Sequence, residues 1–262
     1  VDLGEEKYAR EYLRATRDDH QSVRLVAARA IGTFKLTSGI PHLIERFSDK
    51  NKFVRQAAVD SQIEINTEAV RTAAAEALDS ELGRVRACAS QTLGRLESSV
   101  RAEEHAKLLE DEHVPARRWA AWAMGQIGHK TAGPQLFEIA FAKGQDADTQ
   151  AGAILSMGQL GYRQVLPKCH WLLPQKPTMS SPGKPTPVRI ASARTMGRLQ
   201  DKKGIRLLVG RLNDWNNQMP ELDTVRVAAA IALGRDGSAR ALPVLRNQMT
   251  YDSESNRIRA AC

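Results

Sequence analysis

Aromatic residues make up only 5% of this 262-residue sequence, which is dominated by alanine, leucine, arginine and glutamate. The composition lacks the aromatic and β-branched enrichment of sheets and favours helices that pack through small side chains. No apolar run reaches the length of roughly 18 residues that a membrane-spanning helix needs. The three cysteines, Cys88, Cys169 and Cys262, are too few and too scattered for a disulfide framework. We therefore expect an all-α protein in the cytoplasm, with secretion as the alternative.

Catalytic and metal-binding motifs are also missing from the sequence. The six histidines form no His-x-x-x-His pair, and no Cys-x-x-Cys, glycine-rich phosphate loop or nucleophile elbow is present. Cys169 and His170 are adjacent, so on a helix they would point in different directions. We therefore predict no enzymatic activity, no cofactor and no metal site.

The net charge of +8 is unevenly distributed. Residues 1–131 contain 20 Lys+Arg and 20 Asp+Glu, whereas residues 132–262 contain 18 and 10. Residues 159–211 hold 11 basic side chains and one acid, Asp201. Such a block favours anionic partners through long-range attraction, although a basic surface that only aids solubility is the simpler interpretation.

One phrase recurs along the chain, and its spacing indicates a repeat protein. An apolar residue precedes an arginine, small residues follow, and a glycine stands eight positions after the arginine, as in Val85-Arg86…Ala89…Leu93-Gly94. The arginine position falls at residues 24, 55, 86, 117, 150, 189 and 226, and again at 259; Gln150 replaces the arginine in the fifth copy, and Ile63 replaces the glycine in the second. Each phrase has the apolar periodicity of a helix, and a less regular helix precedes it. The glycine indicates either a close helix approach or a C-terminal turn.

These phrases resemble the short HEAT-like repeat named after phycobilisome lyases, and the resemblance covers essentially the whole chain. It implies an α-solenoid, a right-handed superhelix of about seven to eight HEAT-like helix pairs, in which the second helix of each pair lines the concave side. The expected repeats are 5–36, 37–66, 67–97, 98–129, 130–161, 162–200, 201–236 and an incomplete 237–262 within one domain, 1–262. The resemblance also implies a structural ladder in which each arginine ties its repeat to the acidic turn of a neighbouring repeat, comprising Arg24, Arg55, Arg86, Arg117, Arg189 and Arg226.

Two insertions lengthen the period in repeats six and seven. Residues 174–187 contain five prolines and a glycine, which predicts an exposed loop, and residues 213–224 form the second insertion. Both follow the first helix of their repeat, so we expect them side by side on one edge, as binding inserts or as neutral loop growth.

Exposed positions of the second helices give a candidate partner-binding surface. The helical wheel and the insertions select Arg95, Arg118, Trp122, Gln126, Gln159, Arg194, Arg198, Trp215 and Arg235. Aromatic and arginine side chains are typical of interaction hot spots, although Trp119 and Trp122 can instead pack between repeats four and five.

The sequence thus favours a non-catalytic scaffold that presents a concave, partly basic surface to a protein partner, which we expect to be acidic. The alternative is nucleic-acid binding through repeats five to seven, which lack the stacked aromatics of single-strand binders. A bilin lyase-type subunit is a minor alternative that the resemblance raises.

Because Ile258-Arg259-Ala260-Ala261 opens another second helix, we also expect the native chain to continue beyond Cys262.

Overall fold

The structure is a computed structural model that describes residues 3–178, 181, 183–214, 221–237, 241–250 and 256–261. Its described residues are almost all in helices and the turns between them, with one isolated bridge between Thr178 and Ser181. Among these residues, no helix is both long enough and apolar enough to cross a membrane. The chain is therefore all-α, as the composition predicts.

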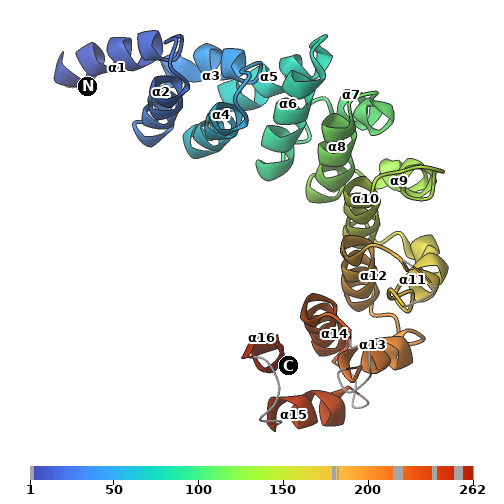
Figure 1. The fold of residues 1–262 in the computed structure, drawn as a ribbon. Coiled ribbons are helices and arrows are strands. Elements are labelled where there is room, and N and C mark those ends of the chain that lie inside the picture. Colours follow the sequence, from blue (N-terminus) through green and yellow to red (C-terminus); the bar gives the residue numbers. More distant parts are fainter. Residues whose placement is uncertain are drawn as a thin grey trace. The chain divides into compact units, whose positions relative to one another are not determined.

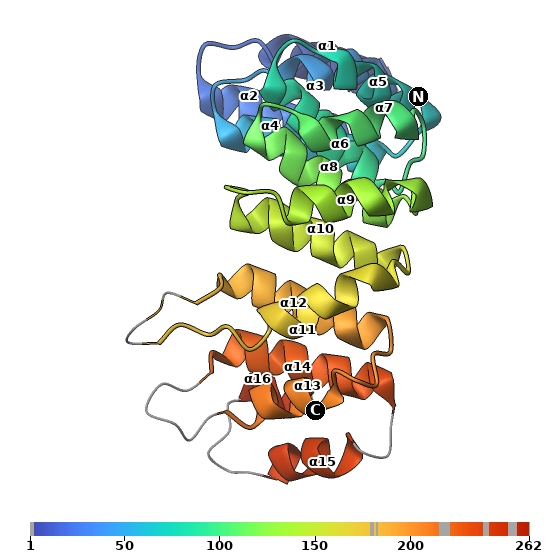
Figure 2. The same ribbon diagram turned by 90° about the vertical axis from the view of Figure 1, so that its right-hand side faces the viewer.

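Two compact units make up the chain, Val1–His129 and Lys130–Cys262. In each unit the helices alternate between two layers along the sequence (Figures 1 and 2). The first unit contains α1 (Leu3–Ala15), α2 (Gln21–Thr33), η1 (Thr37–Gly39), α3 (Ile40–Arg46), α4 (Lys52–Ile65), α5 (Glu68–Glu76), η2 (Ala77–Asp79), α6 (Gly83–Arg95), α7 (Ala102–Lys107), η3 (Leu108–Glu110) and α8 (Val114–Gln126).

The second unit repeats this alternation. It contains η4 (Lys130–Ala132), α9 (Gly133–Ala140), α10 (Ala147–Gln159), η5 (Arg163–Val165), α11 (Leu166–Leu172), α12 (Thr186–Arg198), α13 (Ile205–Leu212), α14 (Asp223–Asp236), α15 (Leu242–Thr250) and α16 (Asn256–Ala261). Several first helices carry a proline in their first turn, among them Pro41, Pro134 and Pro167, where a missing N–H costs nothing. Residues 258–261, on which the expected continuation of the chain beyond Cys262 rests, lie in α16, and Cys262 itself lies outside the described residues.

The second helices of successive pairs pack against one another and form the inner layer of each unit. α2, α4, α6 and α8 are neighbours in the first unit, and α10, α12, α14 and α16 are neighbours in the second. The recurring glycine makes this close packing possible, because a Cβ at Gly94 would lie 2.8 Å from the Cβ of Ala123 and one at Gly197 would lie 2.4 Å from the Cα of Ala232. Of the two roles that the sequence leaves open for this glycine, the close helix approach is observed at Gly32, Gly94, Gly158 and Gly197, whereas a Cβ at Gly234 would meet no described atom within 4 Å.

The helix-ending turn comes three residues later than the glycine. In every pair from α1/α2 to α13/α14, the residue eleven positions after the arginine position has a left-handed backbone: Lys35, Asn66, Glu97, Gly128, Gly161, Gln200 and Gly237. Only three of these seven residues are glycine, so the turn has no consistent sequence signal. A left-handed residue just after a helix is the usual way to satisfy its last carbonyl groups.

Loop residues also differ in detail from the sequence prediction. The described residues of the first insertion are not helical up to Lys184, but its last two residues, Thr186 and Pro187, already belong to α12. A proline at the second position of a helix is compatible with the helical backbone, and this explains why the helix begins earlier than the proline count indicates.

Candidate interaction surface

Two of the four ladder arginines in the first unit, Arg24 and Arg86, each clamp two successive turns together. Arg24 donates Nη1 to the carbonyls of Asp18 and Asp19, at 2.9 and 2.8 Å, on the turn before its own helix. Its Nε and Nη2 donate to the two carboxylate oxygens of Asp49, at 2.7 and 3.0 Å, on the turn of the next pair. Burial is the largest single effect on the pKa of Asp49 and raises it, but the hydrogen bonds from Arg24 and from the Asn51 backbone N–H, with the charge of Arg24, lower the pKa overall. This two-sided contact fixes the spacing of neighbouring repeats.

The same clamp recurs at Arg86, whose Nε and Nη2 donate to Asp111 at 2.6 and 2.7 Å. Arg117 donates to the carbonyl oxygens of Asp111 and Glu112 in its own turn. The resemblance points to an acidic turn in general, whereas the structure shows that the required acid lies 25 residues after the arginine.

In the second unit the clamp is more deeply buried and has other partners. Arg189 is 0% exposed, donates Nε to the carbonyl of Leu173 at 3.0 Å and donates Nη1 to Glu221 at 2.8 Å. Arg226 donates Nε to the carbonyl of Leu212 at 2.9 Å and contacts Gln248. These buried arginines cannot contact a partner.

The predicted surface of the first unit is largely occupied by internal contacts. Arg95 is exposed but forms an ion pair with Asp60 of the neighbouring helix. The Trp122 ring lies against Gly94, where an added Cβ would be 2.7 Å from Cζ3, and contacts Trp119 edge to face at 5.5 Å between ring centroids. Arg118 and Gln126 are half-buried on the same helix. Trp122 therefore packs between α6 and α8, in repeats three and four, and not between repeats four and five as the sequence alternative has it.

The surface of the second unit is different, because its predicted arginines are exposed. Arg194 and Arg198 are one helical turn apart on α12. Arg235, on the adjacent helix α14, stands at the same position of its repeat as Arg198. Among the described residues, none forms an ion pair or hydrogen bond with these three guanidinium groups. On the two neighbouring helices, α10 and α14, the residues at the same repeat position as Arg194 are Leu155 and Ile231, which are apolar and half-buried. Arginines thus alternate with aliphatic side chains on one layer of this unit.

Two other predicted features of this unit are only partly visible. Gln159 is half-buried at the end of α10, and Trp215 lies outside the described residues. The two insertions are in contact, since Lys176 Nζ lies 2.6 Å from Asp214 Oδ2. This ion pair joins the edges of repeats six and seven.

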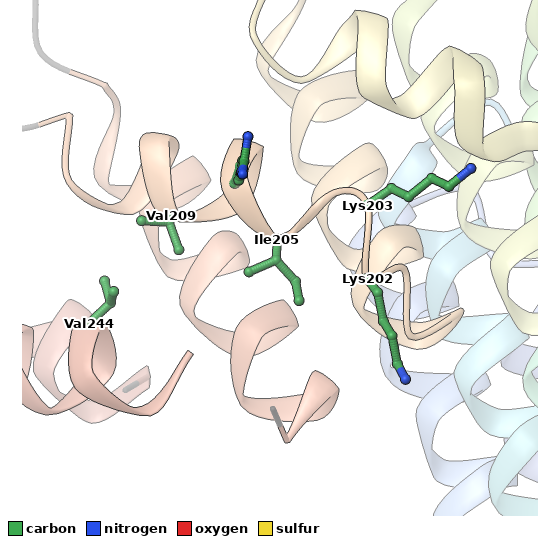
Figure 3. Close-up of a pocket in the computed structure, with 6 residues that line it drawn as sticks. Lys202, Lys203, Ile205, Val209 and Val244 are labelled. Carbon is green, nitrogen blue, oxygen red and sulfur yellow. The ribbon is translucent and has the colours of Figure 1, made fainter. Parts of the chain in front are cut away.

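A wide, shallow pocket of about 800 Å³ opens on the outer layer of the second unit (Figure 3). It is lined by Lys202, Lys203, Ile205, Arg206, Val209 and Val244. Val209 and Val244 face the space between α13 and α15, whereas Lys202 and Lys203 extend away from it. Because these two cations do not converge, the pocket is not built to hold an anion.

The side chains best suited to catalysis are buried. Ser90 Oγ and His105 Nε2 are 2.7 Å apart, but both residues are 0% exposed, and burial lowers the pKa of His105 to about 4. Burial likewise raises the pKa of the Cys169 thiol to about 12, which keeps it protonated and unreactive. Among the described residues, no group of three His, Cys, Asp or Glu side chains is arranged to hold a metal ion.

Sequence reasoning missed a second pocket, in the first unit, of about 240 Å³. It is lined by Lys52, Arg55, Gln56, Arg84, Ala87, Cys88, Gln91, His113, Pro115 and Trp119. Its residues come from three successive repeats in a half of the chain that is neutral overall. The signal that could have found it is the cation two or three positions before the ladder arginine, at Lys52 and Arg84.

Comparison with known proteins agrees with this architecture. No curated protein sequence matches the chain significantly. Among solved structures, Escherichia coli YibA is 19% identical with a TM-score of 0.61, covering 100% of this chain and 96% of YibA. A chain from the complex of CpcE and CpcF of phycocyanin lyase from Nostoc sp. PCC7120 is 17% identical with a TM-score of 0.53, covering 97% and 91%. An engineered protein is 15% identical with a TM-score of 0.50, covering 97% and 76%. At such identities the likeness concerns the fold alone.

Family models match the sequence more directly. The model described as "HEAT repeats" matches residues 10–94 and 180–262, which is more than half of the chain. The model described as "PBS lyase HEAT-like repeat" matches residues 116–136. With the alternating helix layers and the arginine clamps, these matches show that the chain belongs to the HEAT-repeat family.

Proposed function

We propose that this protein is a non-catalytic scaffold that binds an acidic protein partner through the inner helix layer of residues 130–262. The observation that carries the proposal is that the guanidinium groups of Arg194, Arg198 and Arg235, on adjacent helices, are exposed and have no partner among the described residues. Unit charges left without a counterion on one face attract an oppositely charged surface and speed its association.

Aliphatic side chains next to these arginines favour a protein over a nucleic acid. Leu155, Ile190, Val227 and Ile231 are half-buried on the same layer and can pack against an apolar residue of a partner. Apolar contact surrounded by arginine is typical of protein interfaces, whereas single-stranded nucleic acids are bound by stacked aromatic rings. The burial of Ser90, His105 and Cys169 supports the absence of catalysis. A cytoplasmic location fits free, buried thiols at Cys88 and Cys169.

Selection from a library of random displayed peptides against the whole chain tests this proposal, and the partner need not be identified beforehand. We expect enriched peptides to combine Asp or Glu with aliphatic residues. The double variant Arg194→Glu/Arg198→Glu should bind them at least about tenfold more weakly, since two attractive contacts become repulsive. The matched control, Lys203→Glu/Arg206→Glu, changes the net charge equally on the outer layer and should retain binding.

Two results would overturn the proposal. One is enrichment of peptides whose affinity is the same for both double variants. The other is the absence of any enriched peptide together with retention of duplex or single-stranded nucleic acid that Arg194→Glu/Arg198→Glu abolishes. The second result would assign the same surface to nucleic acid.

A further inference from the structure

The arginine ladder of the first unit is interrupted at Arg55. The residue 25 positions after it is Ser80, where the clamps of Arg24 and Arg86 have an aspartate. Ser80 Oγ accepts a hydrogen bond from the backbone N–H of Leu82, as the aspartates do in their turns, but it provides no carboxylate. The acid one residue earlier, Asp79, is bound to Arg101 at 2.6 Å. Arg55 therefore has no carboxylate partner in the described part of the chain.

Only one nitrogen of Arg55 is engaged. Its Nη1 donates to the carbonyls of Asp49 and Lys50, at 2.7 and 3.1 Å, as Arg24 and Arg86 do in their own turns. Its Nε and Nη2, which bind the aspartate in the complete clamps, have no partner among the described residues. These are the two nitrogens of a guanidinium group that match a carboxylate in paired geometry.

Arg55 lines the 240 Å³ pocket of this unit together with two other cations, Lys52 and Arg84. None of the residues that line the pocket is acidic, so the three positive charges are not balanced within it. The amides of Gln56 and Gln91 stand on one side, joined by a hydrogen bond of 3.3 Å. The pocket is therefore a small, positively charged cavity with amide groups at its wall.

The α8 side of the pocket provides a histidine and an apolar wall. His113, the residue before α8, packs on Gly83, where a Cβ would lie 2.4 Å from the Cβ of His113. Its Nδ1 is buried without a hydrogen-bond partner among the described residues. Trp119 adds an aromatic surface to the same lining. A ligand here would meet cations on one side and an apolar ring on the other.

We propose that this pocket is a carboxylate-binding site, in which Arg55, Lys52 and Arg84 hold the anion that Ser80 does not supply. A carboxylate is the group that the complete clamps bind with the same two arginine nitrogens. The volume accommodates one acidic side chain or a small carboxylic acid and excludes a folded segment. The site is in the first unit and is independent of the proposed surface on the second.

The pocket can be tested by restoring the missing acid. In Ser80→Asp, the new carboxylate should accept from Arg55 as Asp49 accepts from Arg24, which removes Arg55 from the pocket. Ser38→Asp adds the same charge at an exposed position of this unit and serves as a control. The exchange Asp79→Ser/Ser80→Asp moves the acid by one residue without changing the net charge.

The measurement is an NMR titration of the whole chain, following the Trp119 indole N–H and the His113 ring. The probes are acetate, inorganic phosphate, and a capped peptide with one glutamate beside its glutamine counterpart, all at constant ionic strength. We expect saturable shifts with acetate or with the glutamate peptide, and binding weakened at least about tenfold in both variants that carry an acid at position 80. Ser38→Asp should bind like the wild type.

The probes separate the two sources of the carboxylate. Binding of acetate alone assigns a small acid, and stronger binding of the glutamate peptide than of its glutamine counterpart assigns the side chain of a partner. The proposal is overturned if no probe gives saturable shifts or if the variants with an acid at position 80 bind like the wild type. It is also overturned if phosphate binds and neither carboxylate does.

Discussion

The buried ion pair between Arg189 and Glu221 should contribute more to stability than any exposed pair of the chain. Arg189 is 0% exposed and Glu221 4%, and the guanidinium group also donates to the carbonyl of Leu173. Removing the negative charge in Glu221→Gln leaves a buried cation whose desolvation is no longer compensated. Breaking a buried pair in this way typically costs about 3–5 kcal/mol. Because glutamine keeps one acceptor oxygen, we expect about 3 kcal/mol.

Urea unfolding followed by circular dichroism measures this change, and hydrogen exchange of α12 and α14 locates it in the second unit. A matched control is Glu45→Gln, which breaks a pair with Arg17 whose side chains are 61% and 41% exposed, and which should leave stability nearly unchanged. The double variant Arg189→Met/Glu221→Leu should be less destabilised than Glu221→Gln, because two apolar side chains need no compensation. Equal unfolding free energies for Glu221→Gln and Glu45→Gln would refute the reasoning.

Three further predictions concern packing, reactivity and pH. Gly94→Ala should destabilise the protein by about 1–3 kcal/mol, because the new Cβ overpacks the contact with α8. Gly234→Ala, with no described atom within 4 Å of the new Cβ, should be neutral or stabilising. Thermal unfolding compares the two variants, and equal shifts in melting temperature would contradict the packing role of Gly94. The thiol of Cys169, whose pKa burial raises to about 12, should react with iodoacetamide at pH 8 only after unfolding, so rapid labelling of Cys169 in the native protein would contradict its burial. Burial lowers the pKa of His105 to about 4 in the folded protein. Between about pH 6.5 and pH 4, His105 therefore binds a proton in the unfolded chain but not in the folded one. The free energy of unfolding should fall by up to about 3 kcal/mol as the pH is lowered over this range. His105→Gln should flatten that part of the pH profile measured by urea unfolding, and an unchanged profile would assign the loss to other groups.

The sequence by itself determined the all-helical repeat architecture. Helix formation and the pairing of successive helices are local, and the apolar-Arg-small-Gly phrase recurs at nearly constant spacing, so one repeat predicts the next. The resemblance to HEAT-like repeats implied the ladder role of Arg24 and Arg86, and the structure identified Asp49 and Asp111 as the acids that they bind. The exposure of Arg194 and Arg198 was also predictable, because an isolated helical wheel already places them away from the packed face.

Only the tertiary structure decided which of these side chains can contact a partner. Arg95 and Arg198 occupy equivalent positions, yet Arg95 is bound to an acid on the preceding second helix, whereas Arg198 has no described partner. Arg189 binds Glu221, 32 residues after it, although Asp214 stands 25 residues after it, because the carboxylate of Asp214 is bound to Lys176. The charged pocket around Arg55 gathers side chains from three repeats, and overall neutrality of that half hides it. Charge and burial at such positions depend on the neighbouring repeats, and the pattern of one repeat does not contain that information.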